Sequence, residues 1–408
     1  MSTSPARFHG IIPPLATPLL DRDTLDVAGL ERLVEHVLAG GVHGLFVLGT
    51  TGEGPALPPA VRRAVVERTV KQVAGRVPVL VGISDTVLAD SLALARFSAD
   101  SGAAAVVAAP PYYFPAGQEP LERWCRTLVA SLPLPLLLYN MPEMVKVVLE
   151  PELVRRLADL PKIVGLKDSG GDLETFAGYS KIVREVRPDW SLLIGPEQML
   201  PQAHALGGHG GVCGGANVLP RIFVDLQAAL ERGDEARAAG LQQKVLALGR
   251  LYTVGTEPGR VIVGVKGALA ALGICSDVTA AWFERLDADH KARIAAIVTE
   301  IGTSEGARSM DREPTYGATF VRHLAKLGRQ TPYRYEDLQL VKAMSQTELA
   351  DWIKTECPEF SEVIRDNPAE VAAEMVHKRR TEMAASSPAA CAAECAVSLL
   401  ELLATLFA

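Results

Sequence analysis

The sequence predicts an α/β protein whose main part is a (β/α)₈ TIM barrel, followed by a helical extension and a separate all-α C-terminal appendage. From residue 10 to about 232, short β-rich apolar runs alternate with amphipathic segments of helical length. That alternation is typical of a parallel sheet wrapped by helices. Eight such pairs can be counted, which is the number that closes this kind of barrel.

The expected strands are apolar on consecutive positions, as in VPVLVGI and LPLLLYN, which favours strands covered on both faces. Apolar residues at helical spacing, such as Leu30, Leu33 and Val37, lie between them. An open doubly wound sheet is the alternative, but it would more often carry a dinucleotide motif, and no GxGxxG follows the first strand. The predicted strands are 11–16, 44–48, 79–83, 104–108, 134–140, 163–167, 192–195 and 211–213.

The domain organisation follows from where the strand signal stops. Residues 8–232 form the expected catalytic barrel, and residues 233–301 are expected to add three helices with no strand between them. Residues 302–314 are polar, with glycine and proline, and are predicted to be a linker. Residues 315–408 show only short helical patterns, which predicts an all-α appendage of unknown role.

Composition excludes several function classes. Apolar residues make up 48% and charged residues 22% of the 408 residues, values typical of a globular chain. The net charge of -7 and the lack of a basic stripe exclude nucleic acid as an expected partner. The N-terminus lacks signal-peptide features and no apolar run is long enough to span a membrane, so we expect a cytoplasmic protein. The six cysteines form no CxxC pair and have no zinc-ligand spacing, which predicts reduced thiols and no metal.

A lysine near the end of an apolar strand is the most informative residue. Lys167 lies in IVGLKDSGG, where burial would disfavour the charged amine and lower its pKa from about 10.4 toward neutrality. A neutral amine attacks ketones to give an imine. The alternative is that Lys167 reaches the surface or pairs with Asp168, and the strand alone does not decide between the two.

Two further motifs follow strands at the carboxyl end of the barrel, where barrel active sites lie. In GTTGEG, Gly49 lets the backbone approach a ligand, and Thr50 and Thr51 offer donors to a carboxylate such as that of a 2-oxo acid. In LYNMP, Tyr139 ends the fifth strand, where its phenol could shuttle protons. The alternatives are a plain glycine-rich turn and a core tyrosine bonded to the backbone.

The paired tyrosines of PPYYFP follow the fourth strand, and such aromatic pairs more often fill an interface than catalyse. Together GTTGE, PYY, YNMP and GLKDSGG come in the order and spacing of the dihydrodipicolinate synthase and N-acetylneuraminate lyase superfamily, which the chain resembles over residues 8–300. The resemblance implies that Lys167 forms a Schiff base, Tyr139 transfers protons, and Thr50 and Thr51 contact the substrate carboxylate. It also implies that Tyr113 completes a hydroxyl relay from Thr50 in a neighbouring subunit, and hence a homodimer or homotetramer.

The sequence also departs from both named enzymes. Met144 stands where dihydrodipicolinate synthases have an arginine that binds the aldehyde carboxylate, and Lys146 is the nearest cation, so aspartate semialdehyde is a doubtful substrate. Glu197 after the seventh strand could accept from a substrate hydroxyl. Cys213 after the eighth is also placed against the substrate, but the hydroxyl residues of neuraminate lyases are missing there. A smaller hydroxylated or apolar aldehyde is therefore expected.

The expected reaction is that of a lyase or aldolase. Lys167 forms a Schiff base with pyruvate or another 2-oxo acid, and the C3–C4 bond of a 4-hydroxy-2-oxo or 2-keto-3-deoxy acid breaks or forms. No cofactor is expected, because the protonated imine is itself the electron sink. The alternatives are a deoxy-sugar-acid dehydratase, a dihydrodipicolinate synthase-like condensation, and a non-catalytic ligand-responsive scaffold.

Overall fold

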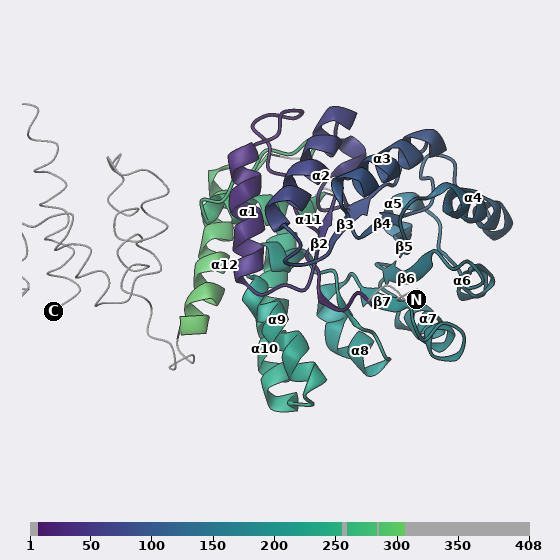
Figure 1. Cartoon of the computed structure of the whole chain (residues 1–408). Helices are drawn as coiled ribbons and strands as arrows, with labels where there is room; N and C mark the ends of the chain where they lie inside the picture. Colours follow the sequence, from purple (N-terminus) through teal and green to yellow (C-terminus); the bar gives the residue numbers. More distant parts are fainter. Residues whose placement is uncertain (1–6, 255–258, 284, 307–408) are drawn as a thin grey trace, which may run out of the picture. The chain divides into compact units, whose positions relative to one another are not determined.

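The computed structural model describes residues 7–254, 259–283 and 285–306, and in this part eight parallel strands form one curved sheet surrounded by helices (Figure 1). The strand order is β1-β8-β7-β6-β5-β4-β3-β2, and each strand pairs in parallel with its neighbour. The predicted barrel is confirmed. The strands are β1 Gly10–Ile11, β2 Leu45–Val47, β3 Val79–Gly82, β4 Ala105–Ala108, β5 Leu136–Asn140, β6 Ile163–Asp168, β7 Ser191–Ile194 and β8 Gly210–Gly211.

The sheet closes through the segment that follows β1. The backbone amide of Leu15 donates to the carbonyl of Phe46 at 2.8 Å, and the amide of Phe46 donates to the carbonyl of Pro13 at 3.0 Å. Pro13 and Pro14 have no N–H, so a regular ladder cannot continue through them. The first strand, expected over 11–16, is consequently only Gly10–Ile11 with a bridge between Pro14 and Phe46.

The segments between the strands form helices because each has apolar residues along one face and because residues at their ends can cap a helix. At α1, the Asp26 carboxylate accepts from the amide of Gly29 at 2.8 Å and so caps the helix, whose buried face includes Leu30 and Leu33. The barrel helices are α1 Val27–Ala39, α2 Pro59–Val73, α3 Leu88–Ser101, α4 Gln118–Ser131, α5 Pro142–Val145, α6 Pro151–Leu157, α7 Leu173–Glu185, α8 Leu200–Ala205 and α9 Pro220–Glu231, with the short 3₁₀ helices η1 Gly54–Ala56, η2 Glu197–Met199 and η3 Gly214–Asn217.

Alternation along the strands divides the buried side chains between two layers. On β5, Leu137 and Tyr139 face the barrel interior with Phe46 and Leu193, whereas Leu136 and Leu138 pack against the helices. Every second residue of a strand therefore points to the axis of the barrel, where polar side chains at the strand ends meet.

Beyond the barrel, three helices form the expected extension: α10 Glu235–Leu248, α11 Arg260–Ala271 and α12 Ala288–Gly306, with η4 Gly249–Thr253 between the first two. The linker was expected from residue 302, but α12 continues to Gly306. One glycine costs a helix only about 1 kcal/mol, and each added residue gains a hydrogen bond, so Gly302 does not end it. The rest of the expected linker and the appendage lie outside the described residues. None of the described helices has the length and apolar character needed to cross a bilayer.

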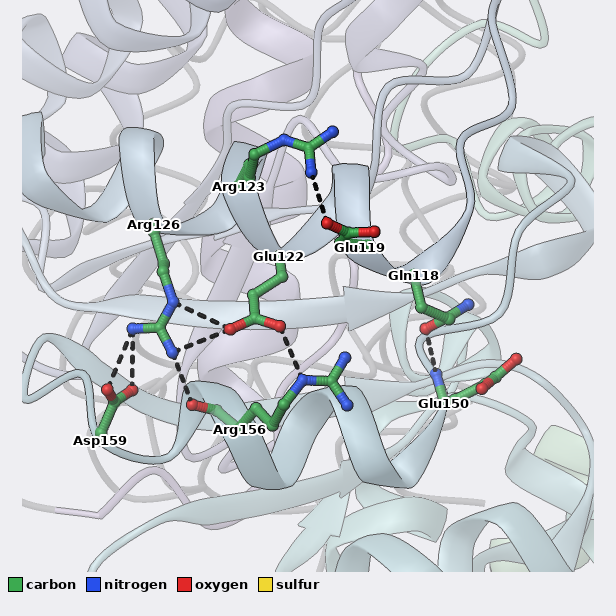
Figure 2. A network of polar contacts seen from close by, with 8 residues as sticks. All are labelled: Gln118, Glu119, Glu122, Arg123, Arg126, Glu150, Arg156 and Asp159. Atoms are coloured by element: carbon green, nitrogen blue, oxygen red, sulfur yellow. Dashed lines mark hydrogen bonds and ion pairs between the residues drawn. The ribbon is translucent and has the colours of Figure 1, made fainter.

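Surface ion pairs join the helices on either side of β5 (Figure 2). Glu122 of α4 contacts Arg126 at 3.0 Å and Arg156 of α6 at 2.6 Å, and Arg126 also contacts Asp159 at 3.0 Å. Exposed pairs contribute only about 0.2–1 kcal/mol each. They connect α4 with α6 and with Asp159 at the surface.

Candidate active site

The β6 strand carries Lys167 into the barrel interior. In the ladder Lys167 lies beside Tyr139 of β5 and Leu193 of β7, both of which face the interior. Its Nζ is 4.1 Å from the centre of the Tyr139 ring and 5.1 Å from the centre of the Phe46 ring. The residue is only 4% exposed, so the interpretation that Lys167 reaches the surface is excluded.

The neighbouring acid faces the other way. The Asp168 carboxylate accepts through Oδ1 from the Asn140 side-chain amide at 2.7 Å and from the amide of Gly170 at 3.0 Å. Its other oxygen, Oδ2, has no hydrogen-bond partner among the described residues, and burial raises the pKa of the Asp168 carboxyl above its usual range. Successive residues of a strand point to opposite faces, which is why Asp168 does not neutralise Lys167.

Two hydroxyl groups meet beside the amine. Thr50 Oγ1 and the Tyr139 phenol are 3.1 Å apart, and either can donate to the other. The Phe46 ring meets the Tyr139 ring edge to face with 6.3 Å between centres, a favourable arrangement for an aromatic pair. The structure thus brings Lys167, Tyr139 and Thr50 together, as the sequence predicted.

The loop that carries the threonines has an unusual backbone. Leu48 and Glu53, on either side of Thr50 and Thr51, have left-handed φ values of 59° and 54°. Such conformations cost a non-glycine residue about 1–3 kcal/mol and persist only where the surroundings enforce them. At Gly49 a Cβ would lie 2.5 Å from the Phe46 ring, so only glycine fits there. Thr51 is buried.

A buried ion pair, not predicted from the sequence, holds the end of this loop. Glu53 Oε1 lies 2.5 Å from Lys266 Nζ of α11, and both side chains are about fully buried, with exposures of 1% and 0%. Glu53 Oε2 accepts from the amides of Ala280 at 2.8 Å and Ala281 at 3.1 Å. Burial lowers the pKa of the Lys266 amine, and the Glu53 carboxylate opposes that effect. A lysine within the apolar run VIVGVKGALAAL was the signal that could have revealed it.

A cavity of about 270 Å³ opens at the Tyr139 and Thr50 hydroxyls. The end of β2, the loop after it and α5 contribute to its walls, and the extension contributes Ile262 and Phe283. Gly49 is part of the lining. Such a space is near the lower end of the roughly 300–1,000 Å³ typical of ligand sites, which indicates a small ligand.

The paired tyrosines after β4 are placed differently from each other. Tyr112 lines the cavity, and burial raises the pKa of its phenol. Tyr113 is 73% exposed, and its ring meets that of Phe114 edge to face with 4.9 Å between centres. Within one chain Tyr113 therefore stands in solvent and is not among the described residues that line the cavity.

The two residues expected against the substrate after β7 and β8 are bonded or packed inside the protein instead. Glu197 accepts from the Tyr252 phenol and from the amide of Gly215, both at 2.8 Å, and burial raises its pKa to about 7. Cys213 is fully buried, and burial holds the pKa of its thiol well above the usual range. The described residues that line the cavity include neither of them, nor Lys167 or Thr51. At Glu197, the phenol of Tyr252 on η4 takes the place expected for a substrate hydroxyl.

Close packing accounts for the glycines around β8. A Cβ on Gly210, whose φ is 154°, would lie 2.0 Å from the carbonyl oxygen of Gly10 on β1. His209 is half-buried and accepts at Nδ1 from the amide of Leu192 at 2.9 Å. The lack of a side chain at Gly210 therefore lets β8 and β1 meet.

Comparison with known proteins agrees with this geometry. The sequence profile of the Dihydrodipicolinate synthetase family matches residues 7–301. The chain belongs to this family. A 4-hydroxy-tetrahydrodipicolinate synthase of Roseobacter denitrificans is 36% identical over 270 residues, 66% of this chain and 90% of that protein. The probable 2-dehydro-3-deoxy-D-pentonate aldolase YjhH of Escherichia coli is 35% identical over 251 residues, 61% of this chain and 83% of that protein.

Solved structures of the Dihydrodipicolinate synthetase family show the same fold. The dihydrodipicolinate synthase of Bacteroides thetaiotaomicron has a TM-score of 0.69 and 45% identity, covering 72% of this chain and 98% of that chain. YagE of Escherichia coli, solved in complex with pyruvate, has a TM-score of 0.69 and 31% identity, covering 73% and 99%. Members of the family are class I lyases and synthases, which form Schiff bases with pyruvate, and family membership makes this chain such an enzyme.

Proposed function

We propose that Lys167 is the Schiff-base lysine and that Tyr139 and Thr50 move the protons of a reversible aldol cleavage. One observation carries this proposal: the Lys167 amine lies 4.1 Å from the ring of a tyrosine whose phenol is hydrogen-bonded to Thr50. The substrate is a 4-hydroxy-2-oxo acid, and the products are pyruvate and an aldehyde.

Imine formation begins with attack of neutral Lys167 on the C2 ketone. The amine loses protons and the C2 oxygen leaves as water, so the site must both donate and accept protons. The pair of hydroxyls on Thr50 and Tyr139, 3.1 Å apart, can pass a proton in either direction because either atom can be the donor. The product of this stage is a protonated imine at C2.

Cleavage then uses the imine as the electron sink. Tyr139 accepts the proton of the 4-hydroxyl, the C4–O bond becomes a carbonyl, and the C3–C4 electron pair moves into an enamine with C2 and the nitrogen. The aldehyde leaves, C3 takes up a proton, and water hydrolyses the imine to pyruvate and free Lys167. The substrate carboxylate is proposed to bind the hydroxyls and amides of Thr50 and Thr51, with Gly49 allowing its close approach.

The assembly is part of the proposal. Tyr113 is exposed within one chain, and we place its phenol at the Thr50 hydroxyl of a second copy, in a homodimer or homotetramer. The exposed Phe114 ring beside it offers apolar area for such an interface. The protein is expected to be cytoplasmic, and the proposed domains are the barrel, the extension through α12 and the appendage beyond the linker.

Borohydride trapping tests the proposal. The full chain is incubated with pyruvate and borohydride and weighed by mass spectrometry, with peptide mapping of the modified lysine. We expect one reduced pyruvyl group on Lys167 and none on the Lys167→Ala variant. Lys181→Ala, which removes an exposed lysine of α7, is the matched control and keeps the adduct. An adduct of equal yield in Lys167→Ala would refute the assignment.

A parallel assay separates cleavage from dehydration. Release of pyruvate from a 4-hydroxy-2-oxo acid is followed with lactate dehydrogenase, and loss of water is followed by mass spectrometry of the same samples. We expect pyruvate. A dehydrated product without pyruvate would show that the C–O bond breaks instead.

A further inference from the structure

We infer that the aldehyde half of the substrate is an unsubstituted alkyl group, so that the enzyme cleaves 4-hydroxy-2-oxo acids with an apolar tail beyond carbon 4. The inference rests on the proposed function, and it names a substrate class that differs from the deoxy-sugar acid in the name of YjhH. Three observations carry it: the mainly apolar lining of the cavity, the absence of a free charge in the described lining, and the engagement of Glu197 and Asn217, which lie outside that lining.

Most of the described residues that line the cavity are apolar, and Ser84 and Tyr112 add hydroxyl groups besides those of Thr50 and Tyr139. After β5 the chain contributes Met141, Met144 and Val145, and the extension contributes Ile262 and Phe283. Methionine side chains are flexible and adapt to small apolar groups. An alkyl tail that binds here is transferred from water to apolar surroundings. Each buried methylene group then contributes about 0.8 kcal/mol to binding.

The described lining offers no charge to a second carboxylate. Glu53 is the only charged residue among the described residues that line the cavity, and Lys266 and two backbone amides already occupy its carboxylate. Lys146, the cation nearest in sequence to Met144, is exposed, and its Nζ donates to the carbonyl of Glu143 at 2.5 Å. An aldehyde with a terminal carboxylate would thus lose its hydration without gaining a partner.

The side of the site beyond β7 and β8 is equally closed to a polyol. Glu197 accepts from Tyr252 and Gly215. The Asn217 side chain accepts from the amide of Ala16 at 3.0 Å and donates to the carbonyls of Pro14 at 3.0 Å and Gly214 at 2.9 Å. Sugar hydroxyls find no free acceptor on these side chains, and an unpaired polar group in a buried site is unfavourable.

Matched substrates test the inference in the cleavage direction. 4-Hydroxy-2-oxohexanoate releases propanal, and 2-keto-3-deoxygluconate has the same carbon chain but releases glyceraldehyde. 4-Hydroxy-2-oxoheptanoate releases butanal, and 4-hydroxy-2-oxoheptanedioate releases succinic semialdehyde of equal length. Pyruvate release gives kcat/KM for each. We expect each alkyl substrate to exceed its polar partner by at least about tenfold, the low end of what one methylene group contributes in an apolar pocket.

Three variants show whether the wall sets this preference. Met144→Arg places a guanidinium in the lining. It is expected to raise the kcat/KM for 4-hydroxy-2-oxoheptanedioate relative to that for 4-hydroxy-2-oxoheptanoate at least tenfold. Met144→Leu is expected to keep the wild-type ratio of these two values. Lys146→Asn removes the exposed cation at a left-handed residue that asparagine tolerates, and it should leave the ratio unchanged.

The outcomes separate this inference from the proposed function. If pyruvate is trapped on Lys167 but the trihydroxy acid or the dioate is cleaved as fast as its alkyl partner, the alkyl class is wrong and the Schiff-base proposal stands. A loss of dioate cleavage in Lys146→Asn would also overturn the inference, because Lys146 would then bind the carboxylate. If pyruvate is not trapped, both proposals fail.

Discussion

Replacing Lys266 by methionine should destabilise the protein far more than the loss of one surface charge. The Lys266 amine and the Glu53 carboxylate are 2.5 Å apart, and their side chains are 0% and 1% exposed. Removing one partner of such a pair leaves an uncompensated buried charge, which typically costs about 3–5 kcal/mol. Domains are stable by only about 5–15 kcal/mol, so the loss is large. Glu53 keeps its bonds to Ala280 and Ala281, which places the expected cost near the lower value.

A double-mutant cycle by urea unfolding measures the pair. Glu53→Gln with Lys266→Met removes both charges while the glutamine carbonyl can still accept from the two amides, and replacing a buried ion pair by neutral groups is often nearly neutral. We expect the double variant to lie within about 2 kcal/mol of the wild type and above Lys266→Met alone. Arg123→Met, which breaks the exposed pair with Glu119 on α4, is the control and should cost about 0.5 kcal/mol or less.

If the Glu53–Lys266 pair positions the threonine loop as well as stabilising the fold, its loss should also lower activity. Glu53 ends the loop that carries Thr50 and Thr51 and has a left-handed φ of 54°. In buffer without urea, at a temperature at which the Lys266→Met variant is still folded, its kcat should be lower than that of the wild type. Pyruvate should still be trapped on Lys167, at a lower rate. The pair does not hold the loop if Lys266→Met lowers the unfolding free energy by less than about 1 kcal/mol. The same holds if the loss in the double variant equals the sum of the losses in Glu53→Gln and Lys266→Met.

Three further predictions follow from the site. Tyr139→Phe and Thr50→Val each remove one hydroxyl of the 3.1 Å contact, and each should lower kcat about 10²–10⁴-fold in the pyruvate-release assay, whereas the thermal midpoint should change little; an unchanged kcat would exclude a proton relay. The pKa of Glu197 is raised from 4.5 to about 7 in the folded protein, so its contribution to stability is present below pH 4.5 and is lost as the pH rises through 7. Between pH 4.5 and 7 this dependence amounts to about 3 kcal/mol of unfolding free energy, at about 1.36 kcal/mol per pKa unit, and Glu197→Gln should remove it. If the variant and the wild type show the same difference in unfolding free energy between pH 4.5 and 7, the prediction is wrong. Glu122→Ala should cost about 1 kcal/mol or less although it breaks two pairs, because both are on the surface; a loss above about 2 kcal/mol in urea unfolding would show that the network of Figure 2 is needed to fix α4 against α6.

The strands and the reactive side chains at their ends could be predicted because both are local in sequence. A run such as LPLLLYN is apolar on consecutive positions whatever it packs against, and the register of a parallel sheet brings its end next to that of IVGLKD. The first strand was predicted too long because the apolar pattern continues through Pro13 and Pro14, which cannot donate to a ladder.

The parts that sequence reasoning missed depend on contacts between distant segments. Glu197 was expected to face a substrate because it follows a strand, but Tyr252, from a short helix outside the barrel, reaches it first. The apolar run around Lys266 indicates that this lysine is buried, but no local pattern identifies Glu53 as its partner. Only the packing of α11 against the loop after β2 makes them partners, and no periodicity in either segment encodes that packing.

The extension therefore belongs to the active site, although it follows the last strand. Lys266 of α11 holds the loop that carries the threonines, and Ile262 and Phe283 line the cavity into which the aldehyde is proposed to leave. The amine and the phenol that are proposed to react come from the barrel, where both side chains lie near the ends of strands whose register is fixed. The groups that we infer to contact the substrate tail come largely from α5 and the extension, which no strand register constrains. Differences in substrate between relatives that share the barrel residues should then arise in these two segments, where one side chain, such as Met144, can change what the cavity accepts.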